Sequence, residues 1–230
     1  MSISESSPGN EKNEISLEER RVIEGIEKLK TSDHTKATIM LIWKGLKPAA
    51  EFDFADYDTE DESDRQEQTL AAEKLFADLK LFSHKIQEQK DVLRYEANGK
   101  DPTPGKFYRD SYYLAKNSND LEYLVDHFGK EENSEITEKL GTILGYPSSA
   151  IDAWNTEDRS VTILDTELEQ PELFARDEMA FAEFRFSKSN WQKEFEVVKK
   201  WADEVKRLDP LLYGRIVSQY HYFLADKDSE

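Results

Sequence analysis

Residues 180–205 read AFAEFRFSKSNWQKEFEVVKKWADEV, and two periodicities follow one another along them. In residues 180–186, apolar side chains alternate with Glu183 and Arg185, which is the pattern of a half-buried strand. The apolar residues then recur at helical spacing, in the order Trp191, Phe195, Val198, Trp201 and Val205. This stretch therefore predicts a strand followed by a long amphipathic helix.

Two helix-start signals accompany this stretch. Ser189 and Gln192 have the spacing of a capping box, which starts the long helix. Asp209 followed by Pro210 places a capping side chain and a first-turn proline at the start of a final helix. The apolar face of that helix consists of Leu212, Tyr213, Ile216, Tyr220 and Phe223. The sequence thus predicts a C-terminal pair of helices.

Helices are also expected earlier in the chain. Ser16 and Glu19 form a capping box, which predicts a first helix from residue 16. Apolar spacing predicts a second helix over residues 67–79. Asn119, with Glu122 three residues later, is expected to cap a further helix, and Gly129 to close it.

Several short runs read as strands. Residues 37–43 are apolar and partly β-branched, and residues 50–54 alternate, so together they predict a hairpin. Residues 82–86 and 92–96 also alternate and predict a second hairpin, with one long helix as the competing interpretation. Further strands are expected at 111–115 and 159–164, and the Gly- and Pro-rich residues 98–106 predict a loop.

The predicted helices and strands do not alternate strictly along the chain, and the sequence contains no internal repeat. The pattern favours an α+β fold, a mainly antiparallel sheet packed with helices, over a doubly wound parallel sheet. Residues 16–225 are expected to form a single domain. We expect residues 1–15 to form a disordered tail without a secretory signal, and residues 226–230 to fray.

Composition narrows the functional classes. None of the 230 residues is cysteine, which excludes disulfides, thiolate metal sites and thiol catalysis, and favours a cytoplasmic location. The net charge of −18 disfavours nucleic acid and anionic lipid as partners. No apolar run approaches the roughly 20 residues that span a bilayer, so no membrane association is expected.

Residues 135–155 read EITEKLGTILGYPSSAIDAWN and predict two helices joined by a tight turn. Gly141 allows close helix contact, Gly145 ends the first helix, and Ser148 is expected to cap the second. The segment resembles the helix-turn-helix unit of bacterial repressors. That resemblance implies DNA binding, for which Ser149 and Asn155 are the candidate contact residues.

The same segment also resembles one in uncharacterised microbial proteins that carry a Leu-Gly-Tyr-Pro turn before a helix. Those proteins often have two cysteines where this chain has Ser148 and Ser149. The resemblance implies no particular activity. Any chemistry that depends on those cysteines is absent here.

No catalytic or cofactor motif stands out. The acidic loop at residues 53–64 lacks the glycine and the spacing of an EF-hand, so we interpret it as solvated, with divalent-cation binding left open. The four histidines form no HExxH pair, and no phosphate-binding loop or GxSxG turn occurs. The sequence therefore predicts no metal site and no cofactor, and assigns no catalytic residue.

The leading functional hypothesis is a non-enzymatic protein-binding or scaffold domain. It rests on the aromatic C-terminal helices, where some side chains are expected to form an interface with a protein partner or a second copy. The candidate interface residues are Tyr213, Tyr220, Tyr222 and Phe223. One alternative is a DNA-binding regulator that uses residues 135–155, and another is an enzyme of unrecognised type with an acidic pocket.

Overall fold

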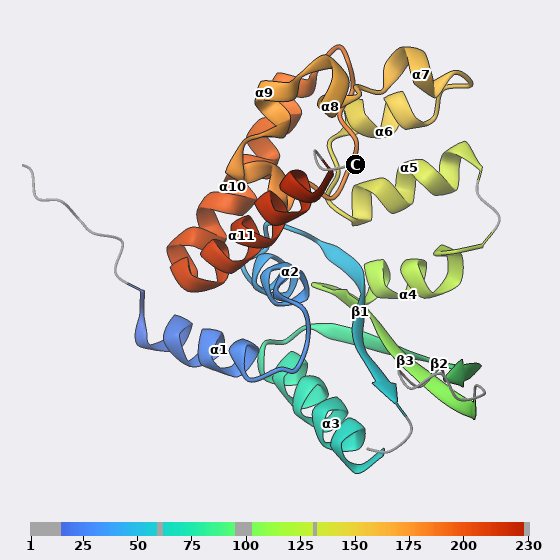
Figure 1. Ribbon diagram of the computed structural model, residues 1–230, viewed down its shortest axis with the longest axis vertical. Coiled ribbons are helices and arrows are strands. Elements are labelled where there is room, and N and C mark those ends of the chain that lie inside the picture. Colours follow the sequence, from blue (N-terminus) through green and yellow to red (C-terminus); the bar gives the residue numbers. More distant parts are fainter. Residues whose placement is uncertain (1–14, 59–61, 95–102, 131–132, 228–230) are drawn as a thin grey trace, which may run out of the picture.

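The computed structural model describes residues 15–58, 62–94, 103–130 and 133–227, in which a small sheet lies at the lower right of the view and most helices lie above it or to its left (Figure 1). The strands are β1 (Ala49–Asp58), β2 (Phe82–Arg94) and β3 (Thr103–Ala115). The helices are α1 (Leu17–Glu27), α2 (Asp33–Trp43), α3 (Glu62–Asp78), α4 (Ser118–His127), α5 (Ser134–Ile143), α6 (Ser148–Trp154), α7 (Arg159–Thr162), α8 (Thr166–Glu169), α9 (Pro171–Phe174), α10 (Trp191–Leu208) and α11 (Pro210–Lys227), with a 3₁₀ helix, η1 (Asp177–Phe181).

The three strands form an antiparallel sheet in the order β1-β3-β2, so the predicted α+β class is confirmed. One face of the sheet belongs to the main core, where Phe54 and Phe76 both meet the ring of Tyr112 edge-on at 5.5 Å. The opposite face packs against α4 and α5 through a smaller core that includes Tyr113 and Leu124. Helices therefore cover both faces of the sheet.

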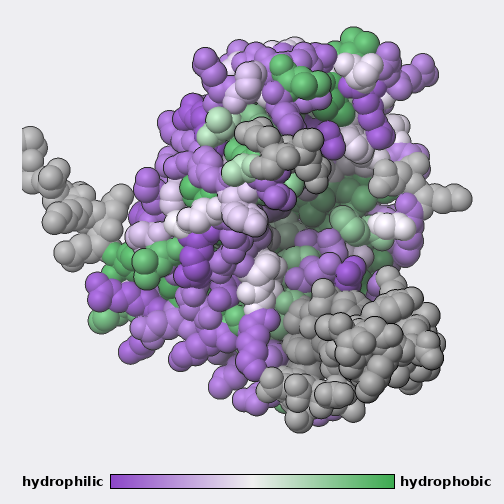
Figure 2. Space-filling model, viewed as in Figure 1, coloured by the Kyte–Doolittle hydropathy of each residue, from purple (hydrophilic) through white to green (hydrophobic). Residues whose placement is uncertain are grey.

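The C-terminal helices α10 and α11 pack against each other and against α2 (Figure 1). The predicted apolar face of α10 is buried, with Trp201 almost fully enclosed. The carboxylate of Asp209 accepts hydrogen bonds from the N–H groups of Leu211 and Leu212, at 3.0 and 2.9 Å, which confirms the predicted cap of α11. Most of the coloured surface in Figure 2 is hydrophilic, in keeping with the charged composition.

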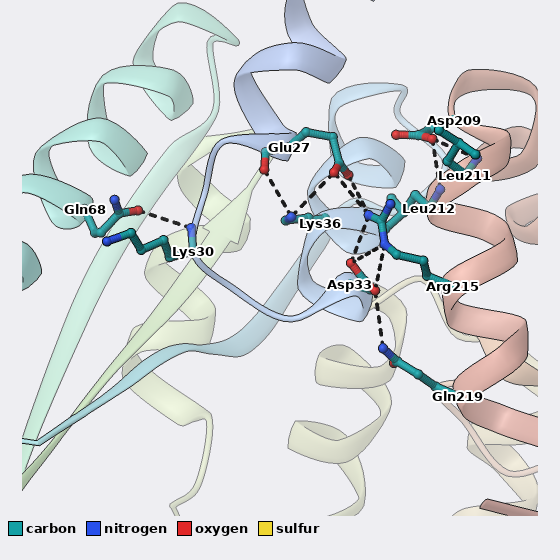
Figure 3. A network of polar contacts seen from close by, with 10 residues as sticks. All are labelled: Glu27, Lys30, Asp33, Lys36, Gln68, Asp209, Leu211, Leu212, Arg215 and Gln219. Carbon is teal, nitrogen blue, oxygen red and sulfur yellow. Dashed lines mark hydrogen bonds and ion pairs between the residues drawn. The ribbon is translucent and has the colours of Figure 1, made fainter. Parts of the chain in front are cut away.

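Arg215 of α11 ties three helices together (Figure 3). Its guanidinium donates to the carboxylates of Asp33 and Glu27 at 3.0–3.1 Å. Lys36 reaches the same corner and donates to the backbone carbonyl of Glu27 at 3.1 Å. This fork of hydrogen bonds fixes α11 against the end of α1 and the start of α2.

The predicted capping box of α1 is confirmed, because Ser16 and Glu19 bond each other's backbone N–H groups. The carboxylate of Glu19 also accepts from Arg207 of α10 at 2.8 Å and from Lys44 at 3.0 Å. Arg207, the Ser16 backbone and Lys44 together hold the pKa of Glu19 well below its ordinary 4.5. One carboxylate thus caps α1 and joins it to α10.

The strand predicted at residues 37–43 is wrong, because these residues belong to α2. The hydroxyl of Ser32 accepts from the N–H of Thr35 at 3.0 Å, so the helix starts before the apolar run. Residues 35–42 are all buried, and a helix that is enclosed on every side shows no helical period in its hydrophobicity. The predicted hairpin is wrong as well, since residues 50–54 lie in β1, which pairs with β3.

The second predicted hairpin and its helical competitor are also wrong. Residues 82–94 form one continuous strand paired along β3, because no Gly or Pro between the two alternating halves turns the chain. Of the predicted loop, residues 103–106 open β3 and residues 98–102 lie outside the described residues. The strand predicted at 111–115 and the helix predicted at 67–79 are confirmed within β3 and α3.

Residues 180–186 do not form the predicted strand. They begin in η1, which ends at Phe181, and residues 182–186 then run outside any sheet, with a bend at Phe184. The alternation instead reflects burial, because Phe186 is enclosed in the core while Glu183 and Arg185 are exposed. The strand predicted at 159–164 is also wrong, since the Asp158 carboxylate accepts from the N–H of Ser160 and starts the short helix α7.

Two predicted caps lie at the wrong residue. Asn117, and not Asn119, caps α4 by accepting from the N–H of Asp120 at 2.9 Å. Helix α10 begins after Asn190 without a side-chain cap, so the predicted box between Ser189 and Gln192 is not formed. Cap positions shift easily by a residue or two when several polar residues precede a helix.

Candidate ligand-binding cavity

The hairpin formed by α5 and α6 is held closed by its glycines. A Cβ on Gly141 would lie 2.7 Å from Cγ1 of Ile151, so only glycine permits this approach of the two helices. Gly145 follows α5 with φ +81°, the left-handed conformation that glycine adopts without strain. Both predicted glycine roles are confirmed, whereas Ser148 is the first residue of α6 and not its cap.

A cavity of about 490 Å³ lies beside this hairpin. Figure 2 shows hydrophobic surface in a hollow next to α5. The volume falls within the roughly 300–1,000 Å³ of sites that hold organic ligands, and the lining is mostly apolar, as in such sites. The lining residues are Phe128, Thr137, Leu140, Gly141, Leu144, Tyr146, Ala150, Ile151, Trp154, Ala182, Glu183, Phe184 and Arg185.

One wall of the cavity carries a charged pair. The carboxylate of Glu183 accepts a hydrogen bond from the ammonium of Lys47 and another from the hydroxyl of Thr38, the latter at 3.2 Å. Lys47 has no exposed side-chain surface, and its ammonium lies 4.9 Å from the centre of the Trp201 ring. The indole N–H of Trp201 donates to the Leu46 carbonyl at 3.3 Å. The buried ammonium of Lys47 therefore anchors Glu183 in the cavity wall.

Tyr146 stands in the turn between α5 and α6, with its ring 5.5 Å from that of Phe184. Burial, reinforced by the negative charges of Glu183 and Glu51, raises the pKa of Tyr146 to about 12. The phenol therefore stays protonated at neutral pH and can donate a hydrogen bond. It is not set up to act as a base.

The two candidate DNA-contact residues are engaged within the chain. The hydroxyl of Ser149 donates to the carboxylate of Glu194 at 2.6 Å, and Glu194, 1% exposed, also accepts from the N–H of Ser187 at 2.7 Å. The side-chain amide of Asn155 donates to the Ser134 carbonyl at 3.4 Å. Ser149 thus fastens α6 to α10, and DNA binding through this helix stays a prediction.

The four candidate interface aromatics divide into two kinds. Tyr213 stacks on Phe181 at 5.4 Å, and the hydroxyl of Tyr220 donates to the Phe174 carbonyl at 2.6 Å. Tyr222 and Phe223 are 76% and 52% exposed. The first two aromatics pack α11 against the protein, and the last two are accessible at its C-terminal end.

Among the described residues, no three His, Asp or Glu side chains are grouped closely enough to hold a metal ion. The predicted acidic loop at 53–64 is wrong at both ends, since residues 53–58 belong to β1 and residues 62–64 to α3. Among its acidic side chains, only that of Asp53 lies within the described residues. None of the described helices combines the length and the apolar character needed to cross a membrane.

Comparison with known proteins indicates neither a family nor a function. No protein family, curated protein or solved structure matches this chain. The two resemblances noted in the sequence therefore stay predictions. Sequence reasoning singled out the α5–α6 hairpin, but it missed Lys47, Glu183 and Phe184, because no spacing or motif connects these distant segments to the hairpin.

Proposed function

We propose that this is a non-enzymatic protein-binding domain, acting in the cytoplasm, that holds an apolar side chain of its partner in the cavity beside the α5–α6 hairpin. The supporting observation is the cavity itself, which has a volume of about 490 Å³ and a mostly apolar lining. Large apolar anchors that fill such pockets supply most of the binding energy in protein complexes.

The polar groups of the cavity support binding over proton transfer. Each oxygen of Glu183 accepts one hydrogen bond from the chain, one from Lys47 and the other from Thr38, so this carboxylate is held in a fixed position in the cavity wall. Tyr146, with its pKa raised to about 12, remains a neutral donor. These groups can orient a ligand, and catalysis would need a further acid or base.

The charge of the chain indicates the class of partner. A net charge of −18 attracts basic surfaces and accelerates their encounter. We therefore expect a partner segment that combines an aromatic or large aliphatic anchor with lysine or arginine. The apolar anchor would supply affinity, and the basic residues would supply selectivity.

A peptide library tests the proposal directly. The full chain is immobilised and exposed to displayed random peptides, and the enriched peptides are titrated by fluorescence anisotropy. Thr137→Trp fills the cavity from α5, because Thr137 lines it. We expect enriched peptides to carry an apolar anchor and to bind this variant at least about tenfold more weakly, as loss of a hot-spot pocket implies.

Thr142→Trp is the matched control. Both threonines lie on α5 and donate to the carbonyl four residues earlier, but Thr142 is exposed and does not line the cavity. This variant should bind as the wild type does. Equal binding by both tryptophan variants, or no enrichment of anchored peptides at all, would remove the cavity as the binding site.

A further inference from the structure

The segment at residues 182–186 has backbone groups without partners. Among the described residues, no hydrogen bond involves the backbone N–H or carbonyl groups of Glu183, Phe184 or Arg185. Beyond them lies an isolated antiparallel bridge between Ile163 and Ser187, in which the N–H of Leu164 donates to the Phe186 carbonyl at 2.8 Å. Glu183 and Arg185 are exposed, so water or a partner must satisfy these groups.

The same segment borders two hollows. One is the cavity beside the hairpin, and the other has a volume of about 340 Å³. Both are lined by Ala182, Phe184 and Arg185. The segment therefore forms a ridge that both hollows adjoin.

Aromatic contacts fix this ridge. The ring of Phe184 lies 5.5 Å from Tyr146, 5.3 Å from Phe186 and 6.0 Å from Trp201, the last edge-on. The pairing edge is thus preorganised, and a ligand that binds it pays little of the entropy of ordering it.

We propose that residues 182–186 accept an extended segment of a partner protein as an added strand. The inference rests on the proposed function and specifies its mode. Main-chain hydrogen bonds to the unpaired groups would supply affinity, and alternate side chains of the added segment would enter the adjoining hollows. Residues 182–186, which have no strand partner among the described residues, alternate apolar and charged side chains and therefore suit this pairing. The bend at Phe184 limits the pairing to a short run.

Charge selects among extended peptides. The second hollow is lined by Asp165 and Glu167 against the single cation Arg185, and the whole chain is strongly acidic. The occupant is therefore an extended segment with apolar residues at alternate positions and a net positive charge. A helical occupant would instead need anchors three and four residues apart.

A backbone scan of a selected peptide tests the mode. Each peptide nitrogen is methylated in turn, which removes one N–H and leaves every side chain in place, and binding to the full chain is measured. We expect losses of about tenfold or more at alternate positions and small effects between them, because successive backbone groups of a strand point to opposite sides. Uniformly small effects would overturn the added strand, while the anchor prediction tested with Thr137→Trp would stand.

Two variants of one residue test the protein side. Arg185→Pro removes a backbone N–H, whereas Arg185→Ala keeps it and removes only the charge. We expect Arg185→Pro to lower the affinity for a basic peptide by about tenfold, because a main-chain donor is lost. Arg185→Ala should raise that affinity slightly, because a charge of the same sign as the peptide is removed. Equal affinities for the two variants, with both folded by circular dichroism, would contradict main-chain pairing. If Arg185→Pro does not fold, the methylation scan with the wild-type chain determines whether the peptide binds as an added strand.

Discussion

Lys47 and Glu183 form an ion pair but differ in burial, so substituting either one should change stability by a different amount. Lys47 is fully buried, whereas the side chain of Glu183 is 35% exposed. Glu183→Gln would leave an ammonium buried without a counter-ion, which we expect to lower the free energy of unfolding by about 3 kcal/mol. Lys47→Met leaves a carboxylate that still reaches water and Thr38, and we expect a loss of about 1 kcal/mol. Urea unfolding at pH 7 measures both.

The double variant isolates the charge effect. With Lys47→Met and Glu183→Gln combined, no charge is stranded, so the loss should be smaller than for Glu183→Gln alone. A methionine can also pack against the Trp201 ring, as Lys47 does now. A larger loss for Lys47→Met than for Glu183→Gln would show that losing the ammonium's hydrogen bond and its contact with the Trp201 ring costs more than leaving its charge unpaired.

At the scale of the element, two helical glycines should respond to alanine with opposite signs. A Cβ at Gly141 would meet Ile151 at 2.7 Å, while a Cβ at Gly214 of α11 would meet nothing within 4 Å. We expect Gly141→Ala to destabilise by about 2 kcal/mol through overpacking, and Gly214→Ala to stabilise by up to about 1 kcal/mol through helix propensity. Thermal and urea unfolding measure both changes.

A double variant tests whether the contact with Ile151 is the reason that Gly141 must be glycine. Against an Ile151→Ala background, the side-chain atoms that oppose a Cβ at Gly141 are gone. Gly141→Ala should then cost nothing or stabilise slightly. An unchanged cost in that background would mean that another contact, and not Ile151, requires the glycine.

The elements also show what a single sequence can predict. Capping signals together with apolar periodicity predicted α1 and α11 correctly. The apolar stripe alone predicted α10, whose expected capping box is not formed. Residues 37–43 and 180–186 were misassigned, since a short apolar run inside the core looks the same in either conformation. The hairpin of the candidate site could be predicted from its glycines. The opposite wall, with Lys47 and Glu183, arises only from tertiary packing, of which the sequence carries no local signal.

For the whole molecule, the net charge of −18 acts on folding and on binding in opposite ways. Excess carboxylates repel one another in the compact state, so the charge disfavours folding at low ionic strength. The same field attracts a basic partner and strengthens its binding under those conditions. Salt should therefore separate the two effects, because screening weakens the repulsion and the attraction together.

We expect the melting temperature to rise by a few degrees between 10 and about 300 mM NaCl, while a selected basic peptide binds about tenfold more weakly over that range. Circular dichroism follows the first and fluorescence anisotropy the second. The control is the same peptide with glutamine in place of lysine and arginine, which should bind with little dependence on salt. A melting temperature that falls with salt would mean that ion pairs such as the one between Arg215 and Asp33 outweigh the net repulsion. A basic peptide insensitive to salt would mean that apolar contacts and main-chain pairing, and not charge, select the partner.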